Sequence, residues 1–107
     1  MKSWEVYICD VGFGPHPAVI VSHPLRSANK PEVDVVRCSS HRAQRQAMGG
    51  EVLLDEADGL DWATLCFCDL IYTVPKSDLS QHRGSVSRER RRAIVQAIIQ
   101  GHDWHSI

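Results

Sequence analysis

The chain has 107 residues, of which 43% are hydrophobic and 23% are charged, and its formal net charge is −1 at pH 7. This length suits a single domain over residues 1–107 with one modest core, and it leaves no room for a separate cofactor domain. The near-neutral charge excludes a polycation, so any nucleic-acid binding must come from a local cluster of Arg and Lys. With neither a signal-peptide h-region nor the ~20 apolar residues that cross a bilayer, we expect a cytoplasmic protein without membrane contact.

Short apolar runs separated by turn-forming residues predict strands in the first half of the chain. The first strand is expected over residues 6–11 and is followed by a Gly- and Pro-rich break at 12–15. The second apolar run, 17–22, is continuous, which predicts a strand that is buried on both faces. A polar loop is expected over 25–32, and a third strand over 33–38.

In the second half of the chain, a loop is followed by two further predicted strands. Residues 39–50 have no hydrophobic period and end in two glycines, which predicts a loop. A short strand is expected over 52–54 and an acidic turn over 55–61. The longest apolar segment, 64–74, is aromatic and too short for most buried helices, so it is predicted to be a strand.

A helix is predicted at the end of the chain. Ser87 is a suitable N-cap, and Gly101 is placed to be the C′ residue. Ile94, Ala97 and Ile98 share one face at helical spacing. Several strands followed by one terminal helix predict a mainly β (α+β) fold, a curled antiparallel sheet with the helix packed on one side.

No metal site or cofactor is expected. Each cysteine lies inside an apolar run, where a reduced thiol behaves as a small buried hydrophobe. Cys66 and Cys68 are expected to point to opposite faces of their strand, which disfavours one metal ion shared between them. His102 and His105 lie near the end of the chain without a nearby third ligand.

Three segments carry a recognisable pattern. The first runs from a strand near 4–10 through a turn to GPHPAVIVS at 14–22. The second is 33–40, which ends in hydroxyl residues. The third is CDLIYTVPK at 68–76, followed by GSVS at 84–87, which leads into the final helix. Together they cover nearly the whole chain, and in this order they resemble the MazF/PemK toxin family, which has a Thr or Ser at the end of the second segment.

This resemblance implies a fold and an activity. The expected fold is an SH3-like curled antiparallel barrel with a C-terminal helix, like that of CcdB and MazF. Such toxins are homodimers that cleave single-stranded RNA without a metal ion, in a groove at the dimer interface. A ribose 2′-OH attacks the neighbouring phosphate, which leaves a cyclic phosphate and a 5′-OH. The C-terminal tail of an antitoxin occupies the same groove and blocks the activity.

His16 is the strongest candidate for proton transfer. It stands where the resembling family has an Arg before the Pro-Ala pair, and the first loop is shorter than in the family. A histidine can take or release a proton near neutral pH, whereas an arginine always keeps its charge. We therefore hypothesise that His16 has taken over the Arg role, with Arg37 or Arg42 supplying the lost cation. The alternative is a turn residue between two prolines.

Two further candidates follow from the resemblance. Ser39 matches the strand-end hydroxyl best and Ser40 nearly as well, and either could donate to a phosphate oxygen or simply bond to the turn backbone. Asp69 lies in a mostly apolar segment, where a carboxylate must find a bonding partner. In PemK-like members the matching aspartate has a proposed acid–base role, and in MazF-like members a structural one.

Two groups of arginines are candidates for contacts with RNA. Arg37, Arg42 and Arg45 cluster beside the serine pair and are predicted to bind the phosphate backbone, the alternative being a solvated loop. The second group starts the final helix and forms either a solvated face or a contact with the antitoxin or RNA. Its members are Arg88, Arg90, Arg91 and Arg92.

Two other functions remain open. Toxins that resemble CcdB have the same barrel and bind DNA gyrase through a C-terminal Trp and Ile, and this chain carries Trp104 and Ile107 near its end. A catalytically inactive regulator is the second alternative, because the family Arg is replaced and the first loop is short.

Overall fold

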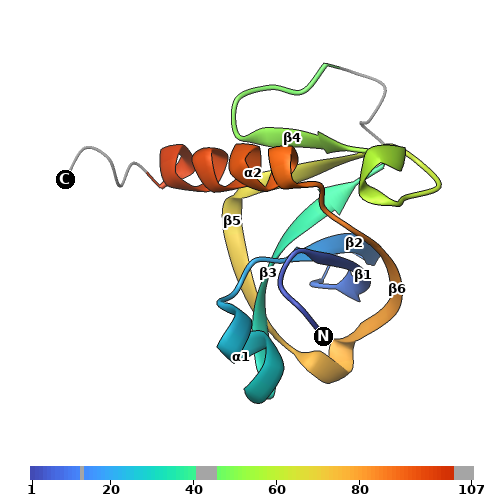
Figure 1. The fold of residues 1–107 in the computed structure, drawn as a ribbon, viewed down its shortest axis with the longest axis vertical. Helices are drawn as coiled ribbons and strands as arrows, with labels where there is room; N and C mark the ends of the chain where they lie inside the picture. The colour runs from blue at the N-terminus through green and yellow to red at the C-terminus, as the bar shows by residue number, and fades with distance from the viewer. Residues whose placement is uncertain (13, 41–45, 103–107) are drawn as a thin grey trace.

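The computed structural model describes residues 1–12, 14–40 and 46–102. Its main element is one six-stranded antiparallel sheet that curls strongly, with a long helix lying across it (Figure 1). This confirms the predicted mainly β fold with a terminal helix. The elements in chain order are β1 (Glu5–Asp10), β2 (Pro15–Ile20), α1 (Pro24–Asn29), β3 (Glu32–Ser39), β4 (Glu51–Leu54), the 3-10 helix η1 (Glu56–Asp58), β5 (Thr64–Pro75), the 3-10 helix η2 (Lys76–Asp78), β6 (Leu79–Ser85) and α2 (Arg88–Gly101).

The strand order in the sheet is β4-β5-β3-β2-β1-β6. The order places the last strand beside the first, so that β1 is covered on both edges by β2 and β6. β3 occupies the middle, between β2 and the long strand β5. Side chains from β2, β3 and β5 can therefore meet on one surface although they are far apart in the sequence.

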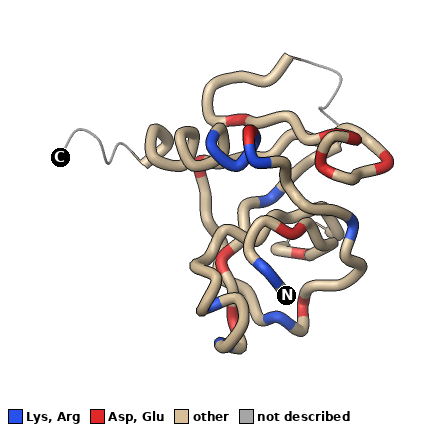
Figure 2. The backbone as a smooth tube through the Cα atoms, viewed as in Figure 1, with Lys and Arg blue, Asp and Glu red and all other residues tan. Residues whose placement is uncertain are grey.

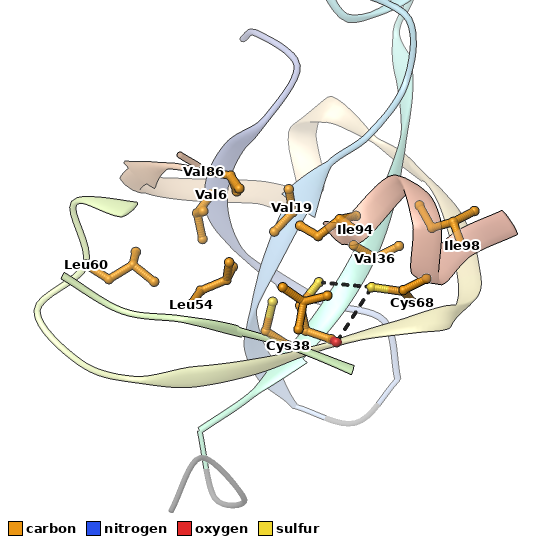
Figure 3. Close-up of a cluster of buried hydrophobic side chains, with 13 residues drawn as sticks. Val6, Val19, Val36, Cys38, Leu54, Leu60, Cys68, Val86, Ile94 and Ile98 are labelled. Atoms are coloured by element: carbon orange, nitrogen blue, oxygen red, sulfur yellow. Dashed lines mark hydrogen bonds between the residues drawn. The ribbon is translucent and has the colours of Figure 1, made fainter. Parts of the chain in front are cut away.

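Two apolar clusters form on opposite faces of the sheet. Along β2, Val19 belongs to the first cluster, whereas its neighbours Ala18 and Ile20 belong to the second, as the alternation of side chains along a strand requires. This confirms that β2 is buried on both faces. Ile94 and Ile98 of α2 pack into the first cluster from above the sheet (Figure 3). The second face has no residue of α2 among its buried members.

All four cysteines are reduced and buried, as expected. The prediction that Cys66 and Cys68 point to opposite faces was wrong, because residues two apart along a strand share a face. Both belong to the first cluster, and the two Sγ atoms are 3.9 Å apart (Figure 3). Hydrogen bonding to Cys38 and to Cys68, together with burial, raises the pKa of the Cys66 thiol.

The polar loop predicted over 25–32 contains a short helix instead. The prolines and polar residues suggested a loop, but they form the start of a helix. Pro24 occupies the first turn, where its missing N–H costs nothing. His23 Nδ1 accepts a hydrogen bond from the Leu25 amide at 3.0 Å. The buried Ser27 hydroxyl lies 3.1 Å from that of Ser22, which ties the helix to the end of β2. The helix ends at Asn29, and β3 begins at Glu32.

Two other parts of the second half differ from the prediction. β6 was not predicted, because its sequence LSQHRGS has almost no apolar alternation. α2 includes Gly101 and is capped by His102, so Gly101 is not the C′ residue. Within the described residues, no helix is long and apolar enough to span a membrane.

The start of α2 is fixed by a buried ion cluster rather than by its N-cap side chain. Ser87 is the N-cap residue, yet its hydroxyl makes no capping bond, and its amide donates to Asp58 Oδ1 at 2.8 Å. Arg90 Nη1 donates to Asp55 Oδ1 and to the buried Asp58 Oδ2, both at 2.6 Å. This cluster joins η1 to the first turn of α2.

Gly84 is required where β6 passes the η1 turn. A Cβ at this position would lie 2.3 Å from the carbonyl oxygen of Asp58 and 3.2 Å from the carbonyl carbon of Gly59. We expect Gly84→Ala to lower the free energy of unfolding by about 1–3 kcal/mol, because the backbone must shift to admit the methyl group. Chemical denaturation measures the change. Gly49→Ala is the control, since no described atom lies within 4 Å of its added Cβ; an equal loss in both variants would contradict the close contact.

Candidate functional site

A tight turn between β1 and β2 sets the position of His16. The Asp10 carboxylate accepts hydrogen bonds from the amides of Gly12 and Gly14 at 2.7 and 3.1 Å. Both glycines have positive φ, 107° and 85°, a conformation that favours glycine. His16 follows as the second residue of β2 and is half-buried. The short first loop therefore fixes where β2 begins, and with it the backbone position of His16.

The sheet register brings His16 and Arg37 to the same surface. His16 pairs with Cys9 on β1, and Ala18, two residues further along β2, pairs with Arg37 on β3. His16 and Arg37 are thus diagonal neighbours on adjacent strands, a relation that separates residues by about 7–8 Å. Both lie on the second face of the sheet, which also carries Cys9 and Ala18.

Arg37 is held on this face by an aromatic ring. Its guanidinium carbon lies 5.0 Å from the centre of the Phe67 ring, within the range of a cation–π contact. The sequence grouped Arg37 with a loop of phosphate-binding arginines, but the structure places it on the sheet surface. The other two members of that group, Arg42 and Arg45, lie outside the described residues.

A cavity of about 320 Å³ opens beside Arg37. It is formed by neighbouring strands β3, β5 and β4, and its lining combines two aromatic rings, two carboxylates, a guanidinium and a leucine. The lining residues are Arg37, Glu51, Phe67, Asp69, Leu70 and Tyr72. Of the residues predicted from the sequence, the cavity brings together Arg37 and Asp69. His16, Ser39 and Ser40 do not line it.

Asp69 does not have the apolar surroundings that its sequence suggested. It is exposed at the point where β5 loses its regular pairing with β3. The end of α2 lies against its backbone, because a Cβ on Gly101 would be 3.2 Å from Asp69 Cα. Glu51, the other carboxylate of the cavity, accepts a hydrogen bond from the Met48 amide at 2.9 Å, which fixes the start of β4. Nothing in the sequence marked Glu51 as a site residue.

The two serines at the end of β3 differ in accessibility. Ser39 is 6% exposed and pairs with Leu65 of β5, whereas Ser40 is exposed. The better sequence match to the family hydroxyl is thus the less accessible of the two.

A cluster of polar side chains joins β1 to β6 and was not predicted from the sequence. Tyr7 and His82 stack with their ring centres 5.1 Å apart, and His82 Nε2 lies 3.2 Å from Glu5 Oε2. The Tyr7 hydroxyl donates to Glu5 Oε1 at 3.3 Å. Burial, followed by the Glu5 carboxylate, raises the pKa of Tyr7. Because β6 was not predicted, no sequence signal could have joined His82 to the first strand.

The basic run at the start of α2 divides into structural and exposed members. Figure 2 shows these cations on the first turns of the helix. Arg90 belongs to the ion cluster with Asp55 and Asp58, and Arg91 Nε donates to the Val86 carbonyl at 2.8 Å. Arg88 and Arg92 are exposed, so only they remain candidates for contact with an antitoxin or RNA.

The described residues include no group of three or more His, Cys, Asp or Glu side chains that could hold a metal ion. His105, like Trp104 and Ile107, lies outside the described residues.

Comparison with known proteins identifies relatives in sequence and in structure. The family model of the PemK-like, MazF-like toxins of type II toxin–antitoxin systems matches residues 2–101, and thus ends before Trp104 and Ile107. No curated protein matches the sequence significantly.

Among solved structures, an endoribonuclease in complex with its cognate antitoxin, from a mycobacterial species, superposes with a TM-score of 0.82 at 26% identity, over 96% of this chain and 95% of its own. The Mycobacterium tuberculosis toxin MazF-mt6 gives 0.79 at 21% identity, over 92% and 96%. A MazE–MazF structure from Deinococcus radiodurans gives 0.72 at 11% identity, over 94% and 92%. The latter two, below 25% identity, establish the shared fold alone.

Proposed function

Because the chain belongs to the PemK-like, MazF-like toxin family of type II toxin–antitoxin systems, we propose that it is a toxin endoribonuclease that cleaves single-stranded RNA without a metal ion. The observation that supports this most directly is the position of His16. The sheet register places it on the same face as Arg37, which lines a cavity with aromatic walls. Single-stranded RNA is commonly bound by stacking of its bases on such rings.

In the proposed reaction, the ribose 2′ oxygen forms a bond to the neighbouring phosphorus while the bond from phosphorus to the 5′ oxygen breaks. His16 takes the proton of the 2′-OH as a general base. The 5′ oxygen takes a proton from solvent water as it leaves, which gives a 2′,3′-cyclic phosphate and a 5′-OH. Arg42 and Arg45 follow Ser40 in the chain and are proposed to neutralise the phosphate, since guanidinium groups pair with its oxygens bidentately.

The serines and Asp69 receive supporting roles. A hydroxyl at the end of β3 is proposed to donate to a phosphate oxygen, and the exposure of Ser40 favours it over the buried Ser39. Asp69 lies in the cavity on β5, with β3 between it and the strand that carries His16. This separation favours a role in binding RNA over direct proton transfer at the cleaved bond. A folded Asp69→Asn variant separates the two, because loss of an acid–base group lowers kcat whereas loss of a binding contact raises KM.

We further propose that an antitoxin tail competes with RNA for the groove in which RNA binds.

We also propose that two copies form a homodimer. The candidate surface is a groove between α2 and the sheet, which is lined largely by apolar side chains, among them Trp4, Val21, Ile71, Val95 and Ile99. Val95 and Ile99 are 41% and 37% exposed, which leaves apolar surface for a second copy to cover. Light scattering on the purified protein gives the oligomeric state.

The direct test is to incubate the purified protein with RNA in the presence of EDTA and to sequence the new 5′-OH ends. We expect cuts at a defined short motif, with cyclic phosphate on the upstream fragments. Absent or random cuts would count against the proposed activity.

A further inference from the structure

Three of the four cysteines lie together inside the molecule, on the face of the sheet that α2 covers. Cys38 comes from β3, Cys66 and Cys68 come from β5, and all three are fully buried in the first apolar cluster (Figure 3). The proposed cleavage reaction uses none of them. We propose that Cys38 and Cys66 form a reversible cross-strand disulfide, which hydrogen peroxide produces and a small dithiol reduces again. This modification site is independent of the proposed ribonuclease activity.

The sheet register places Cys38 directly opposite Cys66 on the antiparallel strands β3 and β5. Residues that oppose each other in this way have Cα atoms about 4.5 or 5.5 Å apart, depending on their place in the hydrogen-bond ladder. Disulfides span Cα separations of about 4.4–6.8 Å. Both side chains point to the same face, since both belong to the first cluster. The backbone therefore already has the separation that a disulfide needs.

The other two pairings of these thiols fit the backbone less well. Cys66 Sγ and Cys68 Sγ are 3.9 Å apart. However, residues two apart along a strand have Cα atoms about 6.4–6.8 Å apart, at the upper limit for a disulfide. Cys68 also has no partner on β3 in the register of the two strands, both of which are fully described, because their pairing is interrupted between Val36 and Cys38. The directly opposed pair is therefore the one that fits.

The disulfide would reinforce the most weakly paired part of β3 and β5. Their regular pairing ends at Val36, and beyond the interruption only the pairs Cys38–Cys66 and Ser39–Leu65 remain. Segments held by few contacts open more readily than long, regularly paired ones. A bond between the two cysteines closes the chain between them into a loop, which restricts the unfolded chain and so favours the folded one. The oxidised protein should therefore open less often than the reduced protein.

The formation of the disulfide is balanced by one molecule of hydrogen peroxide. The thiolate of one cysteine attacks a peroxide oxygen and the O–O bond breaks, which gives a sulfenic acid and a hydroxide that takes up the thiol proton as water. The thiol of the other cysteine then attacks the sulfenic sulfur. The S–S bond forms, the S–O bond breaks, and a second water leaves with the second thiol proton. Two thiols are thus oxidised while one peroxide is reduced to two waters.

The closed structure protects the thiols from this reaction. Hydrogen bonding to Cys38 and to Cys68, together with burial, raises the pKa of Cys66, so little of the reactive thiolate is present. The buried face of α2 belongs to the same cluster and covers the thiols. Peroxide therefore reaches them only in molecules in which α2 has moved away from the sheet. After the bond has formed, the strands can close again around it, because opposed residues keep a separation that suits a disulfide.

Peptide mapping of the wild-type protein tests the bond directly. The protein is treated with hydrogen peroxide in urea just below its unfolding transition, where opening is frequent, and is alkylated and digested. Cleavage by trypsin after Arg37 gives a peptide that begins with Cys38, and cleavage by chymotrypsin after Phe67 separates Cys66 from Cys68. We expect the intact mass to fall by two hydrogen atoms, the Cys38 peptide to be joined to the Cys66 peptide, and dithiothreitol to release both. A bond to another cysteine, over-oxidised thiols without a bond, or thiols that all stay reduced would overturn the proposal.

Thermal unfolding measures the effect of the bond on the fold. The oxidised wild type should have a Tm at least about 5 °C above that of the reduced protein, and dithiothreitol should remove the difference. Cys38→Ala should gain nothing from the same treatment. Cys9→Ala is the matched control, because it also removes a buried thiol but from the opposite face of the sheet; it should keep the full gain. An equal gain in Cys38→Ala, or no gain in wild type that carries the bond, would contradict the proposed reinforcement.

Discussion

His16→Ala should lower the rate of RNA cleavage by about 10²–10⁴-fold, the usual contribution of a general acid or base. The turn that carries His16 is held by the Asp10 carboxylate and two glycines, none of which the substitution touches. The fold should therefore survive, and the loss should fall on kcat. Single-turnover cleavage of a short RNA that contains the mapped motif measures it, with thermal unfolding to verify that the variant is folded.

Two companion variants separate proton transfer from charge. His23→Asn removes an exposed imidazole at the start of α1 but keeps an acceptor for the Leu25 amide, so its rate should stay within about twofold of the wild type. His16→Arg supplies a permanent cation that cannot act as a base near neutral pH, so it should recover only part of the activity lost in His16→Ala. If the folded His16→Ala protein cuts RNA at the wild-type rate, His16 takes no part in the mechanism.

Arg90→Ala should produce the largest loss of stability, about 3–5 kcal/mol, because it leaves the buried Asp58 carboxylate without its positively charged partner. The Asp58 side chain is fully buried and accepts bonds from the Arg90 guanidinium and from the Ser87 amide. Urea denaturation gives the difference in unfolding free energy. Arg92→Ala, an exposed arginine on the same helix, should change stability by no more than about 0.5 kcal/mol.

The same cluster predicts how stability depends on pH. Hydrogen bonding to Arg90 lowers the pKa of Asp55 in the folded state. Between the folded and unfolded pKa values the unfolded chain therefore binds more protons, so this contribution is present above about pH 4 and is lost as the pH falls through the lowered folded value. Arg90→Ala should be less sensitive to acid over this window. Equal acid sensitivity in both proteins would show that the cluster does not control it.

The sequence predicted the fold well where the apolar period was strong. β2, β3 and β5 lie in the interior of the sheet, and each contains a clear apolar run in the sequence. β6 lies at one edge and α1 is only six residues long. Both are stabilised by contacts with distant segments rather than by their own pattern, so local reasoning could not find them.

The candidate site was predictable only in part, for the same reason. The resemblance pointed to His16 and Asp69 because each lies within a matching segment. The cavity depends on Glu51, Phe67 and Tyr72, which meet Arg37 because β4 and β3 pair with opposite edges of β5. Asp69 is exposed where the pairing of β3 and β5 becomes irregular. The sequence around Asp69 contains no pattern that predicts this irregularity.

The buried cysteines allow local opening of the structure to be measured by thiol labelling. Cys9 is 2% exposed and the other three thiols are fully buried, so a water-soluble thiol reagent can react only with molecules that have opened transiently. Two of these thiols are next to residues of the candidate site: Cys9 pairs with His16, and Cys38 precedes Ser39 in the chain. The labelling rate of each cysteine therefore reports how often that part of the sheet separates. A nucleotide that binds the site should protect Cys9 and Cys38, and the degree of protection would give its affinity without any enzymatic assay.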